Sequence, residues 1–210
     1  MGQYYVPIIL NPDESVTTFS NYTFGNSPKL TDHSWIGNSM VNVVYVHIHN
    51  KPRKVAWIGD YSDIEYETSD ASYTKQLPFD EFMKYYSSAR TGEEDETDCY
   101  QIRHYSHDDI NIVNLSSVNF YLVNHTINVY FDLSKYIERC TIKEGYKKGY
   151  CLDPLPLLTA CGNGRGGGDF FNNNTSSGYD QIGTWAFNIL ELCDTQPIRY
   201  VEKSINFIKN

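Results

Sequence analysis

Alternation of apolar and polar residues predicts strands in the first part of the chain. Residues 3–10 alternate and end at an Asn-Pro-Asp turn signature at 11–13, before a second β-prone run at 16–24. We interpret the two runs as an opening hairpin. The short apolar run at 54–58, which Gly59 ends, predicts a buried strand.

Helical spacing of apolar residues occurs in two segments. Asn38 is a good N-cap, and apolar residues recur at helical spacing from Met40 to Ile48. The β-branched residues of this segment leave a strand as the alternative. A second, compact helix is expected after Pro78, up to about Arg90.

The second half of the chain is predicted mainly as strands. Runs at 120–123 and 127–131 flank a turn that contains Asn, which predicts a second hairpin. The segments 155–161 and 182–193 are the strongest later strand signals, and 198–208 fits either a strand or a short helix.

The order of these elements predicts the fold class. Strands outnumber helices and occur as hairpins, without regular strand–helix–strand alternation. We therefore expect an α+β fold, a mainly antiparallel sheet with two or three helices packed on one face. A length of 210 residues fits one domain over 1–210, with a Gly- and Asn-rich loop at 162–178. The 18 tyrosines favour half-buried sheet faces and binding surfaces.

Charge and cysteine content exclude several classes of protein. The formal net charge of −9 opposes non-specific binding of nucleic acid. Five cysteines without a CxxC pair argue against a disulfide framework and a thiolate zinc site, so we expect no metal and no cofactor. The N-terminus does not resemble a secretion signal, and no run of ~18 apolar residues occurs to span a membrane. We expect a cytoplasmic protein.

A glycine-rich segment is the most specific feature of the sequence. Five glycines within residues 162–168 forfeit backbone entropy, so something must need a close approach to the backbone there. Such a loop can direct successive N–H groups at an anion, and Arg165 would add a bidentate fork. The alternative is a flexible connection, since the segment lacks the ending of a Walker A loop. The candidate ligand-binding residues are Gly162, Asn163, Gly164, Arg165, Gly166, Gly167, Gly168 and Asp169.

Two further residues are candidates for chemistry. Asp60 follows the predicted strand at 54–58, where a carboxylate could orient a base, bind Mg²⁺ or hold Arg165. The alternative is an aspartate that caps a turn. His33 could act as an acid or base near neutral pH, and the alternative is a packed, hydrogen-bonded histidine.

Several segments together resemble a family of small uncharacterised proteins that bacteria and their phages encode. These segments are MGQYYVPIIL, HSWIGN, VAWIGDY, FYLVNHT, VYFDL, PLPLLTACGNGRGGGDF and GTWAF. The resemblance brings no catalytic residue with it. It implies a phage or mobile-element accessory protein in the host cytoplasm, for which counter-defence or host takeover is a common purpose.

These observations predict a non-enzymatic binding protein that grips a phosphorylated small molecule or a host protein. The alternative is a small nucleotide- or phosphate-directed enzyme, in which Arg165 stabilises charge and His33 or Asp60 is the acid or base. Convergence of these three residues in one pocket would favour the enzyme, whereas an exposed apolar patch would favour binding to a protein. The oligomeric state is not specified by the sequence.

Overall fold

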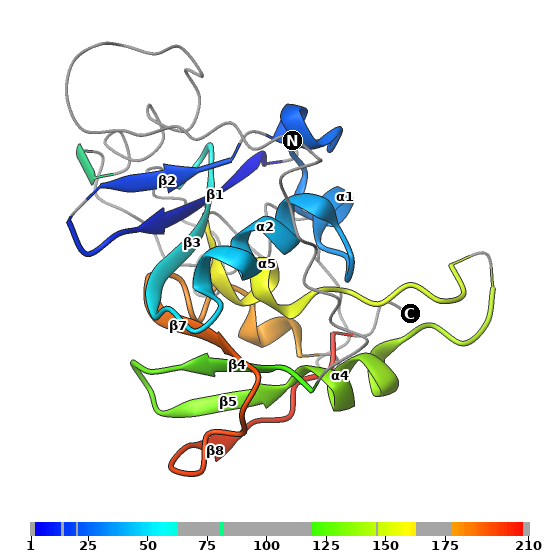
Figure 1. Cartoon of the computed structure of the whole chain (residues 1–210). Helices are drawn as coiled ribbons and strands as arrows, with labels where there is room; N and C mark the ends of the chain where they lie inside the picture. Colours follow the sequence, from blue (N-terminus) through cyan, green and yellow to red (C-terminus); the bar gives the residue numbers. More distant parts are fainter. Residues whose placement is uncertain are drawn as a thin grey trace.

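The computed structural model describes residues 3–13, 15–19, 21–62, 80–81, 119–145, 147–162 and 178–207. Its central feature is an eight-stranded, mainly antiparallel open sheet (Figure 1). The strand order is β2-β1-β3-β7-β4-β5-β8, and β6 pairs with β3. The strands are β1 (Tyr5–Leu10), β2 (Val16–Thr18), β3 (Arg53–Gly59), β4 (Tyr121–Asn124), β5 (Val129–Asp132), β6 (Ala160–Cys161), β7 (Asn188–Cys193) and β8 (Val201–Glu202).

Both predicted hairpins are confirmed. β1 and β2 pair antiparallel with Ile9 opposite Thr17, and β4 and β5 pair antiparallel with Leu122 opposite Phe131. The side chain of Asn124 fixes the second turn. Its Oδ1 accepts hydrogen bonds from the backbone N–H groups of Thr126 at 3.0 Å and Ile127 at 3.3 Å.

The first predicted helix is also confirmed, as α2 (Ser39–Ile48). Asn38 caps it, since Oδ1 of Asn38 accepts from the backbone N–H groups of Met40 (3.0 Å) and Val41 (3.3 Å). The β-branched residues of the segment do not impose a strand, because the cap and the burial of its apolar residues outweigh their weak preference. The helix expected after Pro78 lies outside the described residues, apart from 80–81.

The strand predicted at 155–161 is wrong for most of its length. Residues Pro154–Thr159 form helix α5, and only Ala160–Cys161 form a strand. Asp153 caps this helix by accepting from the backbone N–H of Leu155 at 2.9 Å, and proline suits its first position. All six helical residues are buried. A helix that is apolar on every side shows no amphipathic period, so its sequence resembles a buried strand.

Three other segments differ from the sequence-based expectation. The strand predicted at 182–193 begins only at Asn188, because Ile182–Phe187 form turns and Phe187 has a φ of 63°. Helix α4 (Leu133–Cys140), which Asp132 caps, was not predicted. Within 198–208 the only regular element of the described residues is β8. The short helix α1 (Leu30–His33) and the 3₁₀ turns η1 (Asn21–Phe24) and η4 (Tyr179–Gln181) complete the described elements.

The helices pack against one face of the sheet, which confirms the predicted α+β class. Buried residues of α1, α2, α4 and α5 belong to one core cluster with the side chains of Trp57, Phe131 and Leu192 from the sheet. Residues that alternate with these in β1 and β3, such as Ile8 and Ile58, form a separate small cluster. The described helices number four, one more than expected.

Candidate functional site

Strand pairing brings two of the candidate sequence features together. β3 and β6 run parallel, with Trp57 opposite Ala160 and Ile58 opposite Cys161. Their C-terminal ends therefore lie side by side, so that Gly59 and Gly162 occupy the same end of the sheet. Ser62 joins these ends: its Oγ accepts from the backbone N–H of Gly59 at 3.0 Å and contacts the carbonyl oxygen of Cys161.

The close approach that the sequence implied at Gly162 comes from the chain itself. A Cβ on Gly162 would lie 2.6 Å from Oε1 of Gln3, and a Cβ on Gly59 would lie 2.5 Å from Cδ of the same side chain. Gln3 is buried, and its Oε1 accepts a hydrogen bond of 2.7 Å from the hydroxyl of Tyr5. The glycine at position 162 is thus required by packing against Gln3. The candidate residues Asn163 to Asp169, Arg165 among them, lie outside the described residues.

Asp60 makes backbone contacts at the end of the β1–β3 ladder. Its Oδ1 accepts from the backbone N–H of Tyr4 at 3.0 Å, and its own N–H donates to the carbonyl of Tyr4 at 2.9 Å. These contacts favour the turn-capping interpretation of this carboxylate.

His33 is fully buried beneath β3. Its Nδ1 lies 3.2 Å from the carbonyl oxygen of Ser27, and its Nε2 lies 3.2 Å from the indole Nε1 of Trp57. A carbonyl needs a donor at Nδ1 and an indole N–H needs an acceptor at Nε2, so the partners select one neutral tautomer. Burial lowers the pKa of His33 to about 4. The contacts favour the packed, hydrogen-bonded interpretation over acid–base chemistry.

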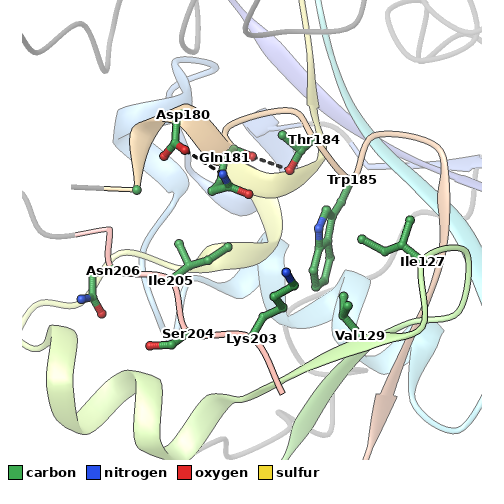
Figure 2. Close-up of a pocket in the computed structure, with 11 residues that line it drawn as sticks. Ile127, Val129, Asp180, Gln181, Thr184, Trp185, Lys203, Ser204, Ile205 and Asn206 are labelled. Carbon is green, nitrogen blue, oxygen red and sulfur yellow. Dashed lines mark hydrogen bonds between the residues drawn. The ribbon is translucent and has the colours of Figure 1, made fainter. Parts of the chain in front are cut away.

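A pocket of about 450 Å³ lies at the other end of the glycine-rich segment (Figure 2). Gly178, the last residue of that segment, lines it. The other lining residues come from the β4–β5 turn and the start of β5, from η4 and the turns after it, and from the segment that follows β8: Ile127, Val129, Asp180, Gln181, Thr184, Trp185, Lys203, Ser204, Ile205 and Asn206. A Cβ on Gly178 would lie 2.7 Å from the carbonyl oxygen of Asn206, so Gly178 is in tight contact with the segment that follows β8.

One wall of the pocket is apolar and held in place by packing. Ile127, Val129 and Trp185 form it (Figure 2). The indole ring of Trp185 packs against the ring of Phe131, with centroids 5.0 Å apart and planes inclined by 31°. Trp185 is buried. It therefore presents a fixed aromatic surface to the pocket.

The opposite wall is polar and internally hydrogen-bonded. The amide of Gln181 donates to Oδ2 of Asp180 at 2.8 Å, and the hydroxyl of Thr184 donates to the carbonyl of Gln181 at 2.8 Å (Figure 2). These bonds fix the turn before any ligand arrives, which lowers the entropic cost of binding.

Lys203 supplies positive charge to the pocket. Its side chain is drawn toward Gln181 and Trp185 in Figure 2. The ion pairs between described residues join His125 with Glu191 and Lys135 with Asp132 and Glu202, so none of them involves Lys203. Sequence reasoning missed this lysine because only the long-range pairing of β8 with β5 brings it beside Trp185.

The described residues give three further findings. No group of three or more His, Cys, Asp or Glu side chains among them is arranged to hold a metal ion. In the same part of the chain, no helix has the length and apolar character to cross a membrane. The four described cysteines, Cys140, Cys151, Cys161 and Cys193, form no disulfide.

Comparison of the chain with models of known protein families, with curated proteins and with solved structures gives no match. The function is therefore argued from the geometry and chemistry of the pocket.

Proposed function

We propose that the chain is a binding protein that holds a small phosphorylated molecule in the pocket between η4 and residues 203–206. The observation that carries this proposal is the position of Lys203 at the pocket that Gly178, the last residue of the glycine-rich segment, also lines. Lys203 is exposed, and it takes part in none of the ion pairs between described residues. A lysine in this position attracts phosphate as a point charge.

The two walls suit the remaining parts of such a ligand. The apolar wall with Trp185 complements a flat or apolar group, while Asp180 and Gln181 offer hydrogen-bond acceptors and donors to hydroxyl groups. The volume of about 450 Å³ falls within the range of roughly 300–1,000 Å³ that small-molecule sites occupy. A nucleotide combines the three chemical groups that this pocket would recognise.

The sequence of the glycine-rich segment supports its part in the proposed site. It runs from Gly162, which packs against Gln3, to Gly178, which lines the pocket. We expect Arg165 and the neighbouring backbone N–H groups to add contacts to the phosphate. The phage or mobile-element setting, with counter-defence or host takeover as the purpose, rests on the family resemblance alone.

Binding is favoured over catalysis because two of the proposed catalytic side chains have structural contacts. His33 is buried against Trp57, and Asp60 binds the backbone of Tyr4. Neither residue lines the pocket. The enzyme alternative therefore has neither His33 nor Asp60 at the pocket, where the described carboxylate is that of Asp180.

Thermal-shift titration with nucleotides, cyclic nucleotides, ADP-ribose and inorganic phosphate tests the proposal. A ligand present at a hundredfold its Kd adds ~2.7 kcal/mol of stability. For a chain of this size the melting temperature should rise by roughly 5–10 °C. Lys203→Gln should reduce this rise strongly, while Lys148→Gln, which makes the same charge change on an exposed turn, should leave it unchanged. A rise that both variants retain, or the absence of any rise, would contradict the proposal.

A further inference from the structure

The two edges of the sheet differ in exposure. At one edge the three residues of β2 are buried. At the other edge β8 is open to solvent: the side chain of Val201 is 65% exposed, and no described strand lies beyond β8. An open strand edge is a template for the addition of another strand.

The backbone of β8 directs free hydrogen-bonding groups outward. The N–H of Val201 donates to the carbonyl of Asn128 at 3.1 Å, and the N–H of Lys203 donates to that of Tyr130 at 2.8 Å. Since alternate residues of a strand point their N–H and C=O groups to opposite sides, those of Glu202 point away from β5. Glu202 therefore presents the donor and acceptor that a further strand would use.

Exposed apolar side chains surround this edge. Ile198 is 96% exposed and Ile127 is 48% exposed, in addition to Val201. Val201 is opposite Val129 in the β5–β8 register, and Ile127 lies in the turn that precedes β5. Charged side chains also flank Val201 on this edge, and such charges prevent pairing with strands that do not complement them.

Side-chain contacts hold the edge in place. The hydroxyl of Tyr200 lies 2.9 Å from Nδ1 of His125, whose Nε2 lies 2.7 Å from Oε2 of Glu191. The carboxylate of Glu202 accepts hydrogen bonds from Nζ of Lys135 at 2.9 Å and from the hydroxyl of Tyr130 at 3.2 Å. These contacts keep the strand extended, so little entropy is lost when a partner strand adds to it.

We infer that β8 accepts an extended segment of a partner protein as an added strand, in which an apolar residue is flanked at alternate positions by acidic residues. Main-chain hydrogen bonds to Glu202 would supply affinity, and side-chain complementarity would supply specificity. Arg199 and Lys203 stand two residues before and after Val201, and neither forms an ion pair with a described carboxylate. Acidic residues on both sides of an apolar residue complement this arrangement.

A second copy of the chain is a poorer occupant. Antiparallel self-pairing centred on Val201 would bring Arg199 of one copy opposite Lys203 of the other. Self-pairing centred on Glu202 would oppose two glutamates. Like charges directly opposite each other destabilise paired strands. The charge pattern therefore favours a different, acidic partner.

Fluorescence polarisation with the labelled peptide Thr-Glu-Thr-Val-Thr-Glu-Thr tests the inference on the full chain. Glu202→Pro removes the outward N–H, yet proline is tolerated on an edge strand whose N–H faces solvent. Glu202→Ala is the matched control, because it loses the same side-chain contacts and keeps the N–H. We expect the peptide to bind the wild type and the Ala variant, and to bind the Pro variant at least about tenfold more weakly, as the loss of a main-chain hydrogen bond implies.

Three results would overturn the inference: no binding to the wild type, equal binding to the Pro and Ala variants, or equal binding of a peptide with lysines in place of the glutamates. A dimer of the wild type that Glu202→Pro dissociates in size-exclusion chromatography would assign the edge to a second copy and would also overturn it. Melting curves of both variants establish that they fold. Lys203 belongs to both proposed sites, but Glu202 does not line the pocket, so Glu202→Pro tests peptide binding without removing a residue of the phosphate site.

Discussion

The carboxamide of Gln3 occupies the space in which a side chain at position 162 would begin. The distance from Oε1 of Gln3 to a Cβ on Gly162 would be 2.6 Å, shorter than real Cβ contacts allow. Gln3 precedes the first strand and Gly162 starts the glycine-rich segment, so this contact joins the beginning of the described chain to the entrance of that segment. It explains why glycine stands at position 162 on packing grounds.

Gly162→Ala should therefore destabilise the protein by roughly 1–3 kcal/mol, the usual cost of overpacking a filled interior. Gly162 has no positive φ, so alanine suits its backbone conformation and the cost comes from the collision with Gln3. Urea unfolding of Gly162→Ala, Gln3→Ala and the double variant measures the coupling. The double variant should be clearly more stable than the sum of the two single effects predicts. Strict additivity would show that Gln3 is not the obstacle.

Two buried titratable groups predict opposite pH dependences of stability. Burial raises the pKa of Asp153 to about 7 from 3.8. The folded state holds this proton more tightly than the unfolded state does, so the stabilisation is complete below pH 3.8 and is lost as the pH rises to about 7. Burial lowers the pKa of His33 to about 4 from 6.5. Its stabilisation is present above pH 6.5 and is lost as the pH falls to about 4.

These effects oppose each other between about pH 4 and pH 6.5, and single variants separate them. Relative to the wild type, Asp153→Asn should gain stability as the pH rises through this window, and His33→Gln should lose it. Each difference should change by roughly 3–4 kcal/mol, at about 1.4 kcal/mol for each pKa unit. Urea unfolding at several pH values measures both. If neither stability difference changed with pH, Asp153 and His33 would not be the source of the predicted pH dependence.

The thiols of Cys151, which is buried, and Cys193, which is half-buried, should react slowly in the folded protein. Burial raises the pKa of Cys151 to about 12, and burial together with Glu191 raises the pKa of Cys193 to about 12. Because the thiolate is the reactive form, alkylation by iodoacetamide at pH 8 should be at least roughly 100-fold slower in the native state than in urea. Peptide mass spectrometry of timed samples gives the rate at each cysteine. Rapid native labelling of either residue would contradict the burial described here.

The sequence predicts elements well where local signals agree with packing. The N-cap at Asn38 and the helical spacing after it define α2, and Asn124 marks the turn of the second hairpin. Prediction fails for the run at 154–159, because a helix buried on all sides has no amphipathic pattern.

The candidate site was less predictable from the sequence. The segment at 162–178 was singled out as unusual, but the pocket that Gly178 lines depends on contacts that are distant in the sequence. Lys203 reaches the pocket through the pairing of β8 with β5, and Trp185 does so through its contact with Phe131. Neither relationship leaves a local pattern. His33 was recognisable as a candidate, but its burial beneath Trp57 depends on the tertiary fold.

Nuclear magnetic resonance of the tryptophan indoles tests the central claim most directly. The chain contains three tryptophans, and of these Trp185 lines the pocket while Trp57 donates to His33. The indole N–H resonance of Trp185, assigned with a Trp185→Phe variant, should shift in a saturable manner as nucleotides, ADP-ribose or inorganic phosphate are added. The resonance of Trp57 should remain in place. If no phosphorylated compound shifts Trp185, or if the shifts appear only at the other two tryptophans, the pocket is not the ligand site.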